Sequence, residues 1–330
     1  MKKFLCILLT VLTVILMASC VSTVTDIESI DHGNEHIGDT IGTKEITSST
    51  NSDNEDIDVT KEVENVTDET PASSDKDEKT TSDEVTIEEK LCFEYKGITV
   101  TAKKIVYDSW EGTGLRLNIA NDTNKTYTVA VENVIVNDCM MVDYFSCEVA
   151  AGKKANDTIY FSSAALDEAG IEQIGKIEIY FYIYDPETYD RVYESECVTI
   201  TTSAYDNMNT ARKNDGHILY EGNDIKIVGQ YVEQYNWLGK SIVLYIENNR
   251  NENVNISCEE MSINGYMVSG WMYETIYAGK YIITEISISD SDLEDNDIDK
   301  IEEFELKFEV KHPDTYKVIF KTDALSFIVG

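Results

Sequence analysis

Residues 177–184 read Ile-Glu-Ile-Tyr-Phe-Tyr-Ile-Tyr, an alternation in which every second side chain is aliphatic or phenyl. Successive side chains of a β-strand point to opposite faces, so period two predicts a strand with one buried face. We expect the buried face to consist of Ile177, Ile179, Phe181 and Ile183. The outer face would then carry Glu178, Tyr180, Tyr182 and Tyr184.

A second copy of this pattern lies about 127 residues further along the chain, at 304–311. At that offset, residues 97–202 align with 224–329 without a gap, and about one position in five is identical. The identities concentrate at apolar positions and at turn residues, where a shared fold constrains the sequence. The chain therefore contains two copies of one domain, joined by the polar segment 203–216.

Each copy contains about seven short alternating segments separated by turn residues, with a single helical turn near 163–170 and again near 290–297. This spacing predicts an all-β fold, two tandem antiparallel immunoglobulin-like β-sandwiches. The other strands expected in the first copy are 98–106, 115–120, 127–136, 140–149, 158–162 and 191–201. We interpret the equivalent pair Trp110 and Trp237 as core or corner residues.

Three motifs accompany the strands: Leu-x-Ile-x-Asn at 117–121, Ile-Asn-Gly at 263–265, and Ala-Gly-Lys at 151–153 and 278–280. With them the two copies resemble the immunoglobulin-like domains of unknown function found in lipoproteins of Gram-positive bacteria. The first copy departs from the corner motif, with Asp138 in place of the glycine. The resemblance implies a β-sandwich on a lipid-anchored stalk, and no chemistry.

The N-terminus has the layout of an export signal. Two lysines precede the apolar stretch 4–17, which ends in Ala18 and Ser19 before Cys20. The stretch is shorter than the roughly 20 residues needed to span a bilayer. Residues 16–20 resemble a lipobox, in which the cysteine is acylated, for example with palmitate. We expect cleavage before Cys20 and a lipid anchor on the outer face of the cytoplasmic membrane.

The segment after Cys20 is rich in Ser, Thr, Asp, Glu and Asn and has almost no aromatic residues. Such a composition predicts a disordered tether, since too little apolar surface is available to offset the ordering entropy. The expected organisation is a signal peptide at 1–19, an acidic tether at 20–90, and sandwich repeats at 91–204 and 205–330. The formal net charge of −35 argues against nucleic acid as a partner.

Five cysteines remain after the leader and Cys20, an odd number that leaves at least one thiol unpaired. None recurs at the equivalent place in the other copy, so we expect small buried side chains rather than a disulfide framework. Cys139 with Cys147, or Cys92 with Cys197, would pair only if the strands bring them together. Cys258 has no obvious mate.

The sequence contains none of the common catalytic motifs, including metalloprotease, nucleophile-elbow and phosphate-loop patterns. Its four histidines fall in the tether, the linker and a turn, so a base for nucleophilic catalysis is poorly supplied. We therefore predict a protein that is not an enzyme and needs no cofactor. The acidic loop Asp290, Asp292, Asp295, Asp297 is a weak calcium candidate that lacks the EF-hand glycine and terminal glutamate.

The tyrosines of the first copy are the best candidate for a binding surface. Tyr180, Tyr182 and Tyr184, with Tyr189 nearby, occur where the second copy has Lys307, Glu309 and Lys311. Exposed tyrosines often bind proteins or sugars. The same residues also serve as cross-strand ladders or domain interfaces.

These patterns favour a non-catalytic, lipid-anchored binding protein whose partner is an envelope protein or glycan. Two alternatives stay open: an enzyme or enzyme subunit acting on cell-wall polymer, and a passive spacer.

Overall fold

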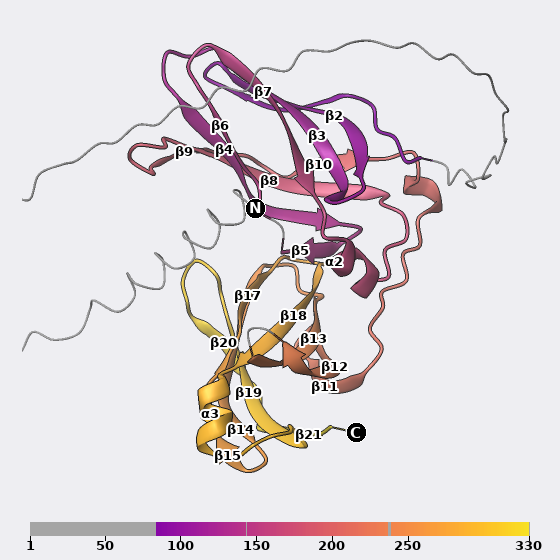
Figure 1. The fold of residues 1–330 in the computed structure, drawn as a ribbon, viewed down its shortest axis with the longest axis vertical. Coiled ribbons are helices and arrows are strands. Elements are labelled where there is room, and N and C mark those ends of the chain that lie inside the picture. The colour runs from indigo at the N-terminus through magenta and orange to yellow at the C-terminus, as the bar shows by residue number, and fades with distance from the viewer. Residues whose placement is uncertain (1–83, 143, 237–238, 330) are drawn as a thin grey trace, which may run out of the picture. The chain divides into compact units, whose positions relative to one another are not determined.

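In the computed structural model the alternating stretch forms the central strand β8 (Lys176–Tyr184) (Figure 1). The structure describes residues 84–329 except 143, 237 and 238. Ile177, Ile179, Phe181 and Ile183 are at most 1% exposed. The predicted buried face is therefore confirmed. The signal peptide, Cys20 and nearly all of the tether lie outside the described residues.

The first repeat is a sandwich of two antiparallel layers. One layer has the strand order β1-β2-β3-β7, and the other begins β10-β8-β4-β5, with β6 beside β4 and β9 beside β8. The strands are β1 (Lys90–Tyr95), β2 (Ile98–Asp108), β3 (Gly112–Asn121), β4 (Tyr127–Val136), β5 (Cys139–Met141), β6 (Ser146–Val149), β7 (Lys153–Tyr160), β9 (Arg191–Glu194) and β10 (Val198–Thr201). One short helix, α2 (Ser163–Glu168), follows β7.

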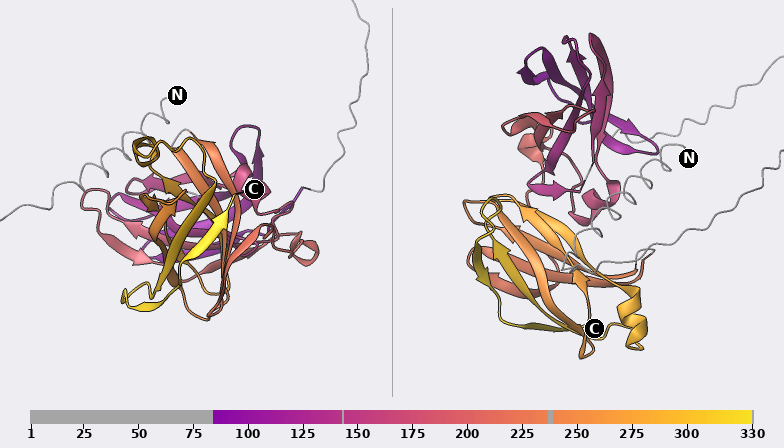
Figure 2. Two further views of the ribbon diagram at one scale, coloured as in Figure 1. Left: turned by 90° about the horizontal axis from the view of Figure 1, so that it is seen from below. Right: turned by 90° about the vertical axis from the view of Figure 1, so that its left-hand side faces the viewer.

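The second repeat has the same two-layer form (Figure 2). One layer contains β18, β13, β12 and β11, with β16 beside β18; the other has the order β15-β14-β19-β20, with β17 and β21 attached. Its elements are β11 (His217–Gly222), β12 (Ile225–Asn236), β13 (Gly239–Asn248), β14 (Val254–Ile263), β15 (Tyr266–Met267), β16 (Gly270–Trp271), β17 (Tyr273–Ile276), β18 (Tyr281–Ile288), α3 (Asp290–Asp295), β19 (Glu303–Lys311), β20 (Val318–Lys321) and β21 (Leu325–Ile328). The prediction of two tandem all-β sandwiches is confirmed.

Buried asparagines explain why the same turn residues recur in both copies. The Asn121 side-chain amide donates to the carbonyls of Lys125 and Val149 at 2.8 Å. Asn248 makes the equivalent bonds to Glu252 and Ile276 at 3.0 and 2.9 Å. These bonds satisfy backbone carbonyls that the turn leaves without a strand partner. The motif asparagine is thus a structural residue.

Several predicted boundaries need correction. The strand expected at 140–149 is divided into β5 and β6, and the one at 191–201 is divided into β9 and β10. The strand expected at 158–162 is β7, which begins at Lys153 because its polar residues extend the backbone pairing with β3, helped by a 2.9 Å hydrogen bond from the Asn118 amide to the Asn156 side-chain oxygen. Trp110 is 95% exposed in the β2–β3 turn, so it is not a core residue. Trp237 lies outside the described residues.

The two repeats share one continuous sheet, because β5 of the first pairs in parallel with β18 of the second. Tyr281 stands opposite Cys139, and Ile282 stands opposite Met140. Met140 packs into the core of the second repeat, while Tyr281 packs into the core of the first. Each core is therefore completed by a side chain from the other repeat. The described residues accordingly belong to one compact unit.

A cluster of four charges lies at this junction. Lys280 contacts Asp138 at 2.6 Å and Glu178 at 2.5 Å, and Lys176 contacts Asp138 at 2.7 Å. Burial alone would raise the pKa of Asp138, but hydrogen bonds from the two ammonium groups hold it below the ordinary value. Asp138 has a positive φ of 69°, a conformation that favours the glycine seen in the second copy. The departure from the corner motif therefore supplies one of the two anions of the junction.

The five described cysteines are all free thiols. Burial raises the pKa of Cys139 and of Cys258 to about 12, and the pKa of Cys92 and of Cys147 to about 11. Thiols with such values carry little thiolate at neutral pH, and the thiolate is the reactive form. Their environment is that of small core side chains.

We predict that Asp138→Asn will weaken the junction while keeping the turn, since asparagine tolerates a positive φ. Loss of the charge should lower the free energy of unfolding by about 1–2 kcal/mol. This is the contribution of a hydrogen bond to a charged group, reduced by partial screening from solvent. Amide exchange at Tyr281, whose N–H donates to the Asp138 carbonyl at 3.1 Å, should accelerate. Gly265→Asn, at the equivalent corner without these lysines, is the matched control and should have little effect.

The same charge predicts the pH dependence of the junction. Because the folded-state pKa of Asp138 is depressed, its stabilisation is present above the unfolded value of about 3.9. It is lost as the pH falls through the folded-state pKa. Urea denaturation should therefore show Asp138→Asn and the wild type converging in stability at strongly acidic pH. A difference that persists unchanged there would contradict the assignment.

We also predict slow alkylation of the buried thiols. At pH 8, iodoacetamide should modify Cys139 and Cys258 in the folded protein at least roughly a hundredfold more slowly than in urea, because little thiolate is present. Peptide mass spectrometry of timed samples measures both rates. Equal alkylation rates for Cys139 in the folded protein and in urea would show that this thiol is not buried.

Candidate functional site

The tyrosine face is the outer surface of β8 around Tyr182 and Tyr184, together with Tyr189 in the following turn. The partners across the sheet are small or polar, since Tyr182 stands opposite Ala130 and Tyr184 opposite Thr128. Small neighbours leave the tyrosine rings standing above the sheet. The rigid strand pairing beneath them fixes their spacing.

The three rings form one stack. The centroids of Tyr182 and Tyr184 lie 5.9 Å apart at an interplanar angle of 27°, and those of Tyr184 and Tyr189 lie 6.2 Å apart at 15°. Tyr189 is 77% exposed and has a φ of 62°, held by its N–H donating to the Asp185 carbonyl at 2.8 Å. The strained turn thus places the third ring in line with the strand.

Arg191 of β9 closes one end of the stack. Its guanidinium carbon lies 4.0 Å from the Tyr182 ring centroid, a cation–π contact. The same guanidinium forms ion pairs with Glu132 at 2.6 Å and Glu194 at 3.3 Å. Burial raises the pKa of Tyr182, and the charge of Arg191 opposes that shift. The face therefore combines aromatic area, one bound cation and an acidic rim.

Tyr180 does not belong to this face. Its ring makes an edge contact with Tyr277 of the second repeat at 4.8 Å between centroids. The Tyr277 hydroxyl accepts a 2.7 Å hydrogen bond from the Asn133 amide. The structure thus divides the predicted site: Tyr180 lies at the junction, while Tyr182, Tyr184 and Tyr189 are brought together in the stack.

The equivalent face of the second repeat carries ions instead of rings. Glu309, which stands in the place of Tyr182, is 4% exposed and pairs with Lys321 at 2.6 Å and with Lys311. Hydrogen bonds from these lysines outweigh burial and lower the pKa of Glu309. The difference between the two copies is therefore a local substitution of an ion cluster for an aromatic cluster.

The calcium candidate is not assembled in the structure. Asp290, Asp292 and Asp295 belong to the short helix α3, and the Asp292 carboxylate accepts the backbone N–H of Ser269. Within residues 84–329, apart from 143, 237 and 238, no group of three or more His, Cys, Asp or Glu side chains is placed to hold a metal. The loop's acids are spread along a helical turn.

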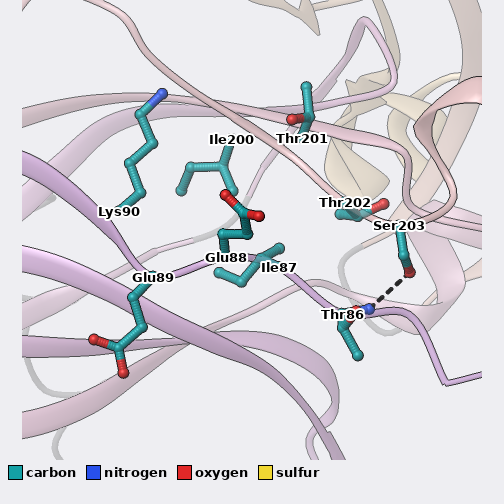
Figure 3. A pocket seen from close by; sticks show the side chains of 9 residues that line it. All are labelled: Thr86, Ile87, Glu88, Glu89, Lys90, Ile200, Thr201, Thr202 and Ser203. Atoms are coloured by element: carbon teal, nitrogen blue, oxygen red, sulfur yellow. Dashed lines mark hydrogen bonds between the residues drawn. The ribbon is translucent and has the colours of Figure 1, made fainter.

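A groove of about 610 Å³ lies between residues 86–90 and 200–203 of the first repeat (Figure 3). Its two sides are joined where the Thr86 N–H donates to the Ser203 hydroxyl at 3.0 Å and the Ser203 N–H to the Thr86 carbonyl at 2.8 Å. Figure 3 shows Glu88 directed toward Ile200 and Glu89 directed away. Most of the side chains that line this groove are exposed, while Ile200 and Thr202 are buried, and it brings together no catalytic pair.

The described histidines serve structural roles. His312 Nδ1 accepts the backbone N–H of Asp314 at 3.2 Å, and His217 packs on Phe327 with centroids 4.9 Å apart. Burial raises the pKa of one carboxyl, Glu274, which accepts a 2.6 Å hydrogen bond from the Thr284 hydroxyl. A hydroxyl partner stabilises this carboxyl without supplying a second acid or base.

Sequence reasoning did not identify Arg191 or Tyr144 as part of the tyrosine face. Tyr144 is 85% exposed, and its phenolate form would raise the pKa of Tyr182. Arg191 begins a strand that pairs with β8, so a prediction of strand pairing would have placed it beside Tyr184. No periodic signal in the sequence reveals Tyr144, because it lies between two strands.

No helix among the described residues is long and apolar enough to cross a membrane.

No family model and no curated protein matches the chain. Solved structures with a related trace include the YadV chaperone, at 11% identity over 71% of this chain and 100% of that chain, with a TM-score of 0.22. A Salmonella enterica SafA pilin–SafB chaperone complex matches at 11% identity over 72% and 98%, with a TM-score of 0.23. A Porphyromonas gingivalis W83 protein of unknown function matches at 10% identity over 66% and 89%, with a TM-score of 0.18.

Proposed function

We propose that the chain is a non-catalytic protein anchored by a lipid to the outer face of the cytoplasmic membrane. It binds a partner protein through Tyr182, Tyr184 and Tyr189. The observation that carries the proposal is the aromatic stack on a rigid sheet, in which Tyr189 is exposed and Tyr182 and Tyr184 are half-buried. Tyrosine and arginine are enriched where protein partners bind, since they offer large contact areas with few rotatable bonds. The apolar leader ending at Cys20 supports the location.

The orientation of the rings favours a protein over a glycan. Nearly parallel rings about 6 Å apart direct their faces at one another, and Arg191 covers the end of the stack at Tyr182. Ring edges and hydroxyls, with the outer face of the 77% exposed Tyr189, are then the parts available to a ligand. A sugar stacks on open ring faces, whereas a protein surface packs well against a row of edges and donates to hydroxyls.

Charge further describes the partner. Glu132 and Glu194 flank Arg191 at the edge of the stack, and acids outnumber basic residues in the chain by 62 to 27. An acidic rim around an apolar centre favours a basic partner surface and speeds its encounter at low salt. The partner we propose therefore has apolar side chains surrounded by lysines or arginines.

Replacing Tyr182 and Tyr184 with the residues of the second repeat, Tyr182→Glu with Tyr184→Lys, should abolish partner binding and leave the fold intact. Both changes lie on the outer face, so the melting temperature should change by only a few degrees. Partner recovery after crosslinking on intact cells, from a photoreactive residue at Tyr189, should fall about tenfold or more. Tyr316→Lys, at the equivalent of Tyr189, is the matched control and should recover the partner normally. Unchanged recovery from the double variant would exclude this face.

The membrane anchor is tested separately. Labelled fatty acid should enter the protein in its bacterial host and be absent from Cys20→Ala, because that thiol is the acceptor the leader predicts. The variant should appear in the culture medium or retain its leader. Equal labelling of the two proteins would contradict the anchor without bearing on the tyrosine face.

A further inference from the structure

Strand β15 of the second repeat is the counterpart of β5, the strand with which the first repeat binds the second. Tyr266 and Met267 stand where the first repeat has Cys139 and Met140. Both strands complete the same hairpin: Ile263 pairs with Tyr266 in one copy, and Val136 pairs with Cys139 in the other. The two segments therefore present equivalent backbone edges.

The two edges differ in whether a strand covers them. Cys139 and Met140 are 2% and 5% exposed beneath β18, whereas Tyr266 and Met267 are 52% and 69% exposed. In the described part of the chain β15 is the last strand of its sheet. β15 is short, as protected edges often are, but its two residues are an aromatic side chain and a methionine, where edge strands commonly carry charge.

The acidic surroundings of the junction also recur beside β15. Glu305 stands in the place of Glu178, which receives the ammonium group of Lys280 at the junction. Glu303 and Glu305 are exposed and line a groove with Gly265 and Ile328. The open end of the second repeat therefore has Glu303 in the place of Lys176 and keeps a carboxylate, Glu305, in the place of Glu178, while Gly265 replaces Asp138. A lysine of an incoming strand has partners there.

The chain's own free edge is a poor match for this surface. The counterpart of β18 is β7, the last strand of its sheet, where Lys154 and Ala155 replace Tyr281 and Ile282. Thr101 and Asn118 replace Val228 and Tyr245, which pack into the first repeat's core at the junction. A second copy would thus bring lysines but no apolar surface, and exposed ion pairs add only about 0–1 kcal/mol.

We propose that β15 is a docking edge for a β-sandwich domain of another protein, through an exposed strand with lysine followed by an aromatic and an aliphatic residue. Lys280, Tyr281 and Ile282 show this order within the chain. The incoming strand pairs in parallel with Tyr266 and Met267, as β18 pairs with β5. Its lysine pairs with Glu305. This surface belongs to the second repeat and is separate from the tyrosine face.

Two peptides taken from the chain itself test the proposal. One spans Ala278–Ile288 and contains the apolar β18 edge; the other spans Ala151–Phe161 and contains the polar β7 edge, and both begin with Ala-Gly-Lys. Each carries a fluorophore and an N-terminal photocrosslinker and is titrated against the whole protein. The first should bind and crosslink near residues 266–267, and the second should not. Tyr266→Lys with Met267→Glu should weaken binding of the first about tenfold or more.

A control variant and the size of the protein in solution separate the alternatives. Tyr316→Lys, a change at another exposed tyrosine of the second repeat, should bind the first peptide normally. Absence of binding, or equal binding by the double variant, would overturn the proposal. Binding of the β7 peptide at least as strongly, with concentration-dependent association of the whole protein that the double variant loses, would assign the edge to a second copy.

Discussion

The parallel pairing of Cys139 and Met140 with Tyr281 and Ile282 is the contact on which the arrangement of the described chain depends. It converts two sandwich layers into one sheet and brings Met140 and Tyr281 into each other's cores. Two residue pairs by themselves contribute few backbone hydrogen bonds between the strands. The charge cluster of Asp138, Glu178 and Lys280 adds directional ion pairs, and side-chain burial adds most of the stabilisation. The junction thus resembles a small core more than a flexible linkage.

Divergence of the two copies follows from this contact. Residues that build the individual sandwich, such as Asn121 and Asn248, have kept identical bonds. Residues at the junction differ between the copies. Asp138 has a positive φ and forms ion pairs with two lysines, whereas its counterpart Gly265 has no such contacts. Position in the assembly, rather than the fold, therefore explains the departure of the first copy from the corner motif.

The sequence predicts the elements whose side chains alternate between core and solvent, and fails where backbone atoms decide the structure. The buried face of β8 follows from its period of two. The start of β7 does not, because Lys153, Lys154 and Asn156 pair with β3 without packing inward. Of the two alternatives predicted for Trp110, core or corner, the core was wrong, because recurrence in both copies suits a turn as well as a core. The alternation along β8 predicted that Tyr180, Tyr182 and Tyr184 share one face of the strand. It could not predict that Tyr180 lies at the junction, because Tyr277, which contacts it, is 97 positions away in the chain.

The two edges β7 and β18 show how one fold gives opposite binding properties. The backbones are equivalent, yet β7 begins with Lys153 and Lys154 while β18 begins with Tyr281 and Ile282. A lysine at an edge must lose its hydration if another strand covers it, so β7 resists pairing, whereas covering Tyr281 removes apolar surface from water. The β18 edge therefore joins the chain's own repeats, while the β7 edge offers a second copy little apolar surface to cover. That asymmetry leaves β15 with an apolar edge that the chain's own β7 does not complement.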